Sequence, residues 1–131
     1  MVTIGRLRVH LVEATLTHDT EFLGKMDPFV KMKCREQEWK SAVMQDAGKH
    51  PVWHSQFFDI NVHYFGDDLE IIVMDEDVTT NDLVGSGVHK LSSLVVDGHG
   101  MDEWFEIQYK GKSAGRVHLK CEWEAAHGHH H

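Results

Sequence analysis

The sequence predicts an all-β fold in which eight short strands form an antiparallel sandwich or barrel. Apolar and polar residues alternate in short segments along the chain, which is the pattern of strands that bury one face. Gly, Asp, Asn and Ser separate these segments at short intervals, as turns do in sandwiches and barrels. No internal repeat, low-complexity tract or linker interrupts the 131 residues, so we expect one domain.

The first two predicted strands cover residues 4–12 and 29–34. The first places apolar side chains alternately with two arginines and a histidine, and the second alternates apolar residues with Lys31 and Lys33. Successive side chains of a strand point to opposite faces, so each segment has one apolar face for a core and one basic face for solvent.

Six further predicted strands follow at short intervals. They cover residues 38–44, 52–62, 69–74, 83–91, 104–109 and 116–123. The segment 69–74 is apolar throughout after Glu70, and 116–123 alternates clearly. A brief helical turn is expected over residues 92–96. Five large apolar side chains are expected in the core, namely Trp53, Phe57, Leu83, Trp104 and Trp123.

Composition and charge narrow the class of protein. A hydrophobic content of 41% and a charged content of 26% are ordinary for a globular domain. Cys34 and Cys121 lie in apolar-patterned segments and are expected as buried free thiols rather than a disulfide. The net charge of −8 argues against nucleic-acid binding and against constitutive attraction to anionic lipid.

The ends of the chain and its hydropathy lead to three further expectations. No apolar run reaches membrane-spanning length, and the N-terminus lacks the pattern of a signal peptide, so we expect a cytoplasmic protein. The domain is expected to span residues 1–124. Residues 125–131 end in histidines, resemble the remnant of a purification tag, and carry no functional argument.

Carboxylates gather in two intervals between predicted strands. Residues 15–27 contain Asp19, Glu21 and Asp27, and residues 75–82 contain four further acids. Loops at the same end of a sandwich cluster together, so the two intervals can converge. Asp27 precedes a proline, which favours an extended conformation and directs its side chain at the strand entry.

The acids that follow the apolar strand 69–74 favour a metal site. Asp75 and Asp77 lie two residues apart in an extended segment and therefore share a face, where their like charges repel. Calcium, which binds six to eight oxygen ligands, would relieve that repulsion. The alternative is a solvated charged edge that discourages strand pairing. An EF-hand is excluded, because Thr80 replaces its glycine and Ser86 replaces its closing glutamate.

Several segments in the same order resemble the C2 domain family. They are Gly-Arg-Leu-Arg-Val-His-Leu-Val-Glu-Ala over 5–14, Phe-Leu-Gly-Lys-Met-Asp-Pro-Phe-Val over 22–30, His-Pro-Val-Trp-His over 50–54, and Leu-Glu-Ile-Ile-Val-Met-Asp-Glu-Asp-Val-Thr-Thr-Asn-Asp-Leu-Val-Gly over 69–85. The sequence looks most like the small plant-type proteins that consist of one C2 domain. The resemblance implies an eight-stranded antiparallel Greek-key sandwich of type II topology.

The resemblance also implies a calcium site formed by the first and third loops. Asp27, Asp75 and Asp77 match the family's acidic positions. Glu21 occupies a position where the family usually has Asp, and Asp82 lies one residue closer to Asp77 than is usual. The expected metal ligands are therefore Glu21, Asp27, Asp75, Asp77 and Asp82, with calcium as the cofactor.

Lipid contacts are expected at two places. Phe22 and Leu23 lie at a predicted loop tip, where they either enter the lipid interface or fold back against the sandwich. Lys31 and Lys33 match a strand on which the family often carries a basic patch, and the alternative is an ordinary solvated strand face.

These features predict a non-catalytic module that binds anionic phospholipid membranes when calcium is present. No phosphate loop, Gly-x-Ser-x-Gly motif or Cys/His pairing indicates an enzyme. The alternative function is a calcium-independent adaptor that binds a protein partner. In either case we expect a cytoplasmic monomer that does not bind nucleic acid. The calcium-dependent module would in addition move to the membrane surface when calcium rises.

Overall fold

The computed structural model describes residues 2–21 and 24–126, apart from the side chain of Ser55. Eight strands form the body of the fold: β1 (Gly5–Leu16), β2 (Pro28–Cys34), β3 (Gln37–Lys40), β4 (Val52–Val62), β5 (Asp68–Glu76), β6 (Asn81–Lys90), β9 (Asp102–Tyr109) and β10 (Lys112–Ala125). A short 3₁₀ helix, η1 (Leu91–Ser93), and a small hairpin of β7 (Val95–Val96) and β8 (His99–Gly100) join β6 to β9.

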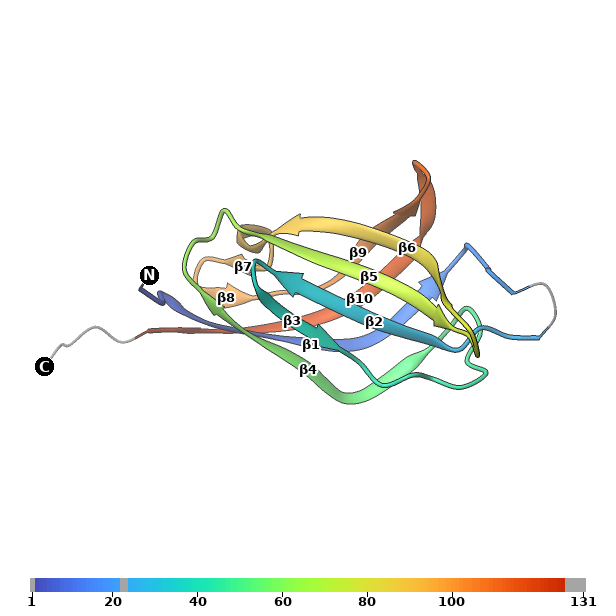
Figure 1. The fold of residues 1–131 in the computed structure, drawn as a ribbon. Helices are drawn as coiled ribbons and strands as arrows, with labels where there is room; N and C mark the ends of the chain where they lie inside the picture. The colour runs from blue at the N-terminus through green and yellow to red at the C-terminus, as the bar shows by residue number, and fades with distance from the viewer. Residues whose placement is uncertain (1, 22–23, 127–131) are drawn as a thin grey trace, which may run out of the picture.

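The eight strands form an antiparallel sandwich of two four-stranded layers, as predicted (Figure 1). One layer has the order β3-β2-β5-β6 and the other the order β9-β10-β1-β4. The layers join in hydrogen-bonding order through a single residue pair, Ser86 on β6 and Gln108 on β9. β1 leads into the 17–27 loop and β10 follows β9, which is the connection expected for type II topology.

The core lies between the two layers and is built by strict alternation. On β5, Leu69, Ile71 and Val73 are fully buried, whereas the residues between them are partly exposed. β1 contributes Leu7 and Val9 in the same way. Cys34 and Cys121 are buried and unpaired, as the sequence predicts, and burial raises the pKa of the Cys121 thiol to about 12.

Two predicted elements differ from the structure. The third strand was expected over residues 38–44 but ends at Lys40. There the hydroxyl of Ser41 accepts the backbone N–H of Val30 at 2.9 Å, so a side chain takes the place of a ladder partner and the chain leaves the sheet. The helical turn expected over 92–96 covers only Leu91–Ser93, and β7 follows it.

Three side chains expected in the core face solvent instead. Phe57 and Trp104 each precede another aromatic residue in a strand, and neighbouring side chains cannot both point inward. Phe58 and Phe105 take the inward positions, which leaves Phe57 and Trp104 38% and 39% exposed. Leu83 faces outward opposite Met74. Two further predictions are confirmed, because Trp53 is buried and Trp123 packs against the core.

One end of the sandwich carries four connections: residues 17–27, 41–51 and 77–80, and the turn of the β9–β10 hairpin (Figure 1). The first and last described residues lie toward the opposite end. β10 reaches Ala125, which pairs with Gly5, one residue beyond the expected domain boundary. Within residues 2–21 and 24–126, no helix is long and apolar enough to cross a membrane.

Candidate functional site

The two acidic intervals meet at the four-connection end of the sandwich. β2 and β5 are neighbours, so the register places Pro28 opposite Asp75 and brings the loop before β2 against the end of β5. The backbone N–H of Glu76 donates to the carbonyl oxygen of Asp27 at 3.0 Å, which fixes this junction. The sequence shows only that the two acidic intervals can converge; the pairing of β2 with β5 brings them together.

Asp75 is the buried anchor of this junction. Alternation along β5 places its side chain on the core side, where it is 0% exposed. Its Oδ1 accepts the backbone N–H of Asp27 at 2.8 Å, and its Oδ2 accepts the hydroxyl of Thr20 at 2.7 Å. A buried carboxylate is tolerated when it is hydrogen-bonded, and these bonds tie the 17–27 loop to β5.

Three carboxylates converge beside this anchor. One carboxylate oxygen from each of Glu21, Asp77 and Asp82 lies within 4.8 Å of the others. Glu21 is positioned by its own backbone, whose N–H donates to Oδ1 of Asp19 at 2.9 Å. Glu21, Asp27 and Asp77 also line one hollow of about 400 Å³. Four of the five predicted acids, Glu21, Asp27, Asp77 and Asp82, therefore lie around one open space, whereas Asp75 is buried.

The cluster carries uncompensated negative charge. A hydrogen bond with the Asp75 side chain and the negative charges of Asp75, Asp77 and Asp27 raise the pKa of Glu21 from 4.5 to about 7. Such a shift is expected where carboxylates approach each other without a cation between them.

The donor set fits a hard cation. The cluster offers only oxygen atoms, which are the ligands of calcium and magnesium, and the described part of the chain brings no histidine or cysteine into it. Oδ1 of Asp27 accepts the N–H of Asp46 at 2.6 Å, and Oδ1 of Asp77 accepts the N–H of Val78 at 2.6 Å. Each of these bonds orients a carboxylate while its second oxygen stays open to a ligand.

The two predicted lipid contacts have different outcomes. Phe22 and Leu23 lie outside the described residues. Lys31 and Lys33 are exposed on the outer face of β2. Lys31 lies opposite Lys40, whereas Lys33 lies between two glutamates, Glu38 of β3 and Glu70 of β5. The register therefore balances the charge of Lys33 and leaves Lys31 and Lys40 as the positive part of this face.

Several residues of the site were not found from the sequence. Thr20, Gln45 and Asp46 hold or line the acidic hollow, and two of them come from the 41–51 connection. That connection has no acidic pattern that would mark it. Asp46 has a left-handed backbone conformation, with a φ of 54°, but this feature is visible only in the structure.

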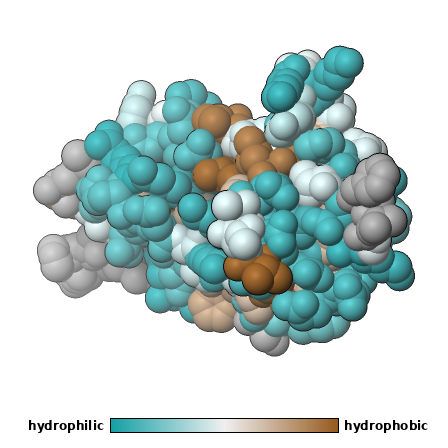
Figure 2. All heavy atoms as spheres, turned by 45° about the vertical axis from the view of Figure 1, so that its right-hand side comes forward, coloured by the Kyte–Doolittle hydropathy of each residue, from teal (hydrophilic) through white to brown (hydrophobic). Residues whose placement is uncertain are grey.

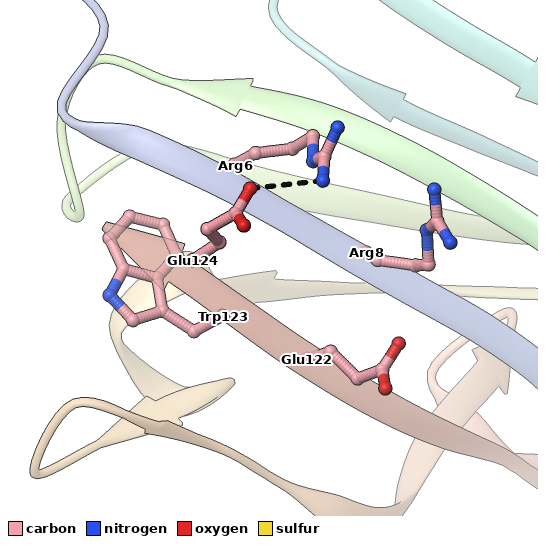
Figure 3. Close-up of a pocket in the computed structure, with 5 residues that line it drawn as sticks. All are labelled: Arg6, Arg8, Glu122, Trp123 and Glu124. Atoms are coloured by element: carbon pink, nitrogen blue, oxygen red, sulfur yellow. Dashed lines mark hydrogen bonds and ion pairs between the residues drawn. The ribbon is translucent and has the colours of Figure 1, made fainter. Parts of the chain in front are cut away.

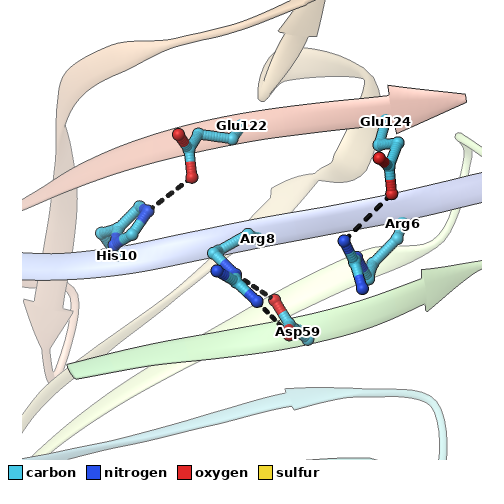
Figure 4. Close-up of polar contacts among 6 residues, drawn as sticks. All are labelled: Arg6, Arg8, His10, Asp59, Glu122 and Glu124. Atoms are coloured by element: carbon cyan, nitrogen blue, oxygen red, sulfur yellow. Dashed lines mark hydrogen bonds and ion pairs between the residues drawn. The ribbon is translucent and has the colours of Figure 1, made fainter. Parts of the chain in front are cut away.

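A second hollow, of about 260 Å³, lies at the other end of the sandwich on the outer face of β1 and β10. Arg6, Arg8, Glu122, Trp123 and Glu124 line it (Figure 3). These charges are already paired across the strands (Figure 4). Arg6 donates to Glu124 at 3.0 Å, Arg8 binds Asp59 through two hydrogen bonds of 2.8 and 2.9 Å, and His10 pairs with Glu122 at 2.8 Å.

This cross-strand ladder is structural. The bidentate bond from Arg8 lowers the pKa of Asp59, and the bond with His10 lowers the pKa of Glu122. Because these charges already satisfy each other, the hollow offers little to a charged ligand. Figure 2, turned toward the four-connection end, shows a mainly hydrophilic surface with apolar side chains gathered in separate small areas.

Comparison with known proteins adds to this geometry. The sequence pattern of the C2 domain family matches residues 5–107. The chain is 37% identical over 113 residues to 16 kDa phloem protein 2 of Arabidopsis thaliana, covering 82% of this chain and 76% of that protein. It is 34% identical over 123 residues to human extended synaptotagmin-3, covering 91% of this chain.

A solved structure agrees with these relatives. A calcium-bound pair of C2 domains from extended synaptotagmin 2 aligns with a TM-score of 0.78 and 30% identity, over 93% of this chain and 46% of that one. The chain spans only 13% of the length of human extended synaptotagmin-3. The similarity to that relative therefore concerns one domain of a much longer protein.

Proposed function

This chain belongs to the C2 domain family, and from that premise we propose that it is a calcium-dependent module that binds anionic phospholipid membranes. The family is typically a non-catalytic binding module. The proposed contact surface is the end of the sandwich that carries the acidic cluster, and the proposed cofactor is calcium. Membrane association would then be peripheral and would follow calcium.

The observation that carries this proposal is the convergence of Glu21, Asp77 and Asp82 within 4.8 Å. Together with Asp27 they would hold the ion, and Asp75 would support them from beneath through its bonds to the 17–27 loop. Calcium accepts this type of ligand and tolerates an irregular arrangement of carboxylates. The raised pKa of Glu21 supports the same interpretation, because a cation there would relieve the repulsion that causes it.

The protein's own charges determine when the membrane is bound. Without a cation, the clustered carboxylates face an anionic bilayer and are repelled by it. A bound calcium ion supplies positive charge and open coordination positions for lipid oxygens. Val78, which is 99% exposed next to Asp77, is then placed to enter the lipid interface. Binding should weaken as salt screens these charges.

Two measurements on one set of proteins test the proposal. Calorimetry measures calcium binding, and sedimentation with mixed phosphatidylcholine–phosphatidylserine vesicles measures membrane binding with calcium or with a chelator. The parent should bind both, and Asp77→Asn should lose both. Asp97→Asn is the matched control, since Asp97 is exposed in the β7–β8 turn, where Asn is equally acceptable. Equal vesicle binding by the parent and Asp77→Asn would reject the proposal.

A second candidate function is calcium-independent binding of an acidic protein partner. The supporting observation is the exposed pair Lys31 and Lys40, directly opposite each other on β2 and β3. A Lys31→Gln/Lys33→Gln variant that loses a partner but keeps its calcium response would favour this function. Loss of calcium-triggered vesicle binding in Asp77→Asn would favour the first.

A further inference from the structure

The β9–β10 hairpin projects from the same end of the sandwich as the acidic loops (Figure 1). Its turn consists of Lys110 and Gly111, and Lys112 opens the following strand. Both lysines are exposed, and neither forms an ion pair with any residue that the structure describes. The tip of this hairpin is therefore a positive projection beside a negative cluster.

The turn conformation makes Lys110 an unusual residue for its position. Lys110 and Gly111 have φ values of 50° and 79°, as the two-residue type I′ hairpin turn requires. Asn, Asp or Gly is preferred at the first of these positions, because a longer side chain is strained in the left-handed region. The β7–β8 turn at the opposite end has the same conformation with the favoured pair Asp97 and Gly98. The lysine at the loop end is thus held where it costs local stability.

The hairpin is also joined firmly to the 17–27 loop. The ring of Tyr109 stacks on the ring of His18, with centroids 4.1 Å apart and an angle of 28° between the planes. Nδ1 of His18 lies 2.7 Å from the carbonyl oxygen of Val84, and the N–H of Thr17 donates to the carbonyl of Ala114 at 2.9 Å. The hairpin and the start of the acidic loop therefore hold a fixed position relative to each other.

A hollow of about 400 Å³ separates the hairpin from the acidic cluster. His18, Asp19, Thr20, Asp82, Leu83 and Tyr109 line it. Asp82 belongs to both the hollow and the cluster. Lys110 follows Tyr109 in the chain, and its Nζ lies 5.3 Å from the centroid of the Tyr109 ring. One hollow is therefore lined both by a residue of the acidic cluster and by the last residue of β9, next to the hairpin turn.

We propose that the β9–β10 hairpin is a second membrane contact, in which Lys110 and Lys112 bind the anionic headgroups of the bilayer that the calcium loops engage. This inference rests on the proposed function, because the loops bring the hairpin to the surface. The proposed partner is the surface of an anionic bilayer, in which many negatively charged headgroups lie in one plane. The two contacts have different roles: the loops make membrane binding depend on calcium, and the hairpin makes it depend on the negative charge of the lipid.

The test compares two double variants that remove the same charge. Lys110→Asn/Lys112→Gln neutralises the hairpin and gives its turn a favoured residue, so the fold is preserved. Lys90→Gln/Lys120→Gln removes two exposed lysines from elsewhere on the sandwich. Lys90 forms an exposed ion pair with Asp68 at 2.8 Å, and a surface pair of this kind contributes little to stability. Calcium binding is measured by calorimetry. Vesicle affinity is measured with phosphatidylcholine alone and with phosphatidylcholine–phosphatidylserine mixtures, at saturating calcium.

The hairpin variant should bind calcium like the parent and bind the anionic vesicles about 30-fold more weakly, roughly fivefold for each lysine. The vesicle affinity of the control double variant should stay within about twofold of that of the parent, because its two lysines lie away from the proposed membrane contact. Unchanged affinity in the hairpin variant would overturn the inference, and so would an equal loss in both variants. If the parent itself does not bind vesicles, or if Asp77→Asn binds them as the parent does, the proposed function is wrong, and the result does not concern the hairpin alone.

Discussion

Neighbouring carboxylates in the acidic cluster have different roles. Asp75 is buried and accepts hydrogen bonds from Asp27 and Thr20, whereas Asp77 is exposed at the end of the same strand. The first supports the loop, and the second is the one that we propose as a metal ligand. The sequence shows two aspartates at i and i+2, and only burial distinguishes them.

Asparagine substitutions should separate these roles. Asp75→Asn leaves one oxygen for two donors, so the free energy of unfolding in chelator should fall by about 1–3 kcal/mol. Asp77→Asn removes an exposed charge and should change it by less than about 0.5 kcal/mol, yet abolish calcium binding. Urea denaturation and calorimetry measure the two effects. Equal stability of the two variants would contradict the anchoring role of Asp75.

Glu21 should make the metal-free protein sensitive to pH. Its pKa is raised from 4.5 to about 7, so the folded protein holds this proton more tightly than the unfolded chain. Its contribution to stability is therefore complete below pH 4.5 and is lost as the pH rises through about 7. The thermal midpoint measured in chelator should show this loss.

Glu21→Gln provides the control for the pH effect. The variant has no proton to lose at this position, so its thermal midpoint should vary less with pH over the same interval. Calcium should also flatten the pH dependence of the parent, because the cation takes the place of the proton. A parent and a variant with identical profiles would show that Glu21 does not titrate there.

At the scale of elements, the register between paired strands determines where the loops of the candidate site lie. Pairing of β2 with β5 brings Asp27 to Asp75, and pairing of β1 with β10 sets the start of the 17–27 loop. Gly115 lies at the second of these points, opposite Leu16, where the β9–β10 register shifts. The connections therefore depend on the strands that precede them.

Gly115→Ala should disturb both the strand and the loop. Gly115 has a φ of +126°, and a Cβ atom there would lie 2.2 Å from the carbonyl oxygen of Thr15. We expect the free energy of unfolding to fall by about 3 kcal/mol, because backbone strain and a backbone clash act together. Gly98→Asn is the control, since its Cβ would meet nothing within 4 Å and Asn tolerates its φ of +77°. Its stability should change by less than about 0.5 kcal/mol.

At the scale of the whole molecule, net charge and charge placement act in opposite directions. The chain carries a net charge of −8, which opposes contact with an anionic surface. The exposed lysines of the β9–β10 hairpin lie at the end where the proposed contact forms. A local positive region can therefore direct binding even though the molecule as a whole is acidic.

Calcium should stabilise the whole domain if it binds only the folded protein. At one hundred times its dissociation constant it should add about 2.7 kcal/mol to the free energy of unfolding. The thermal midpoint should therefore rise with calcium concentration, and it should stay constant in Asp77→Asn. A midpoint that calcium does not move in the parent would argue against a site that requires the fold.

Much of the fold could be predicted from the sequence, because alternation is a local property. Eight strands, their approximate bounds and the buried free cysteines follow from the spacing of apolar residues. The order of the C2-like segments also places acids in two loops. The short β3 could not be predicted, since it depends on a bond between Ser41 and the distant Val30.

Residue order was enough to establish the class of fold and to indicate the residue types of the candidate site and the two loops that contain them. Which acids meet depends on tertiary structure: Glu21, Asp77 and Asp82 converge while Asp75 is buried beneath them. Tertiary packing also turned Phe57 and Trp104 outward, and strand pairing placed the β9–β10 hairpin beside the acidic end. The physical reason is that alternation along a strand gives two equivalent faces. Only the register between strands distant in sequence selects the face that is buried and the loops that become neighbours.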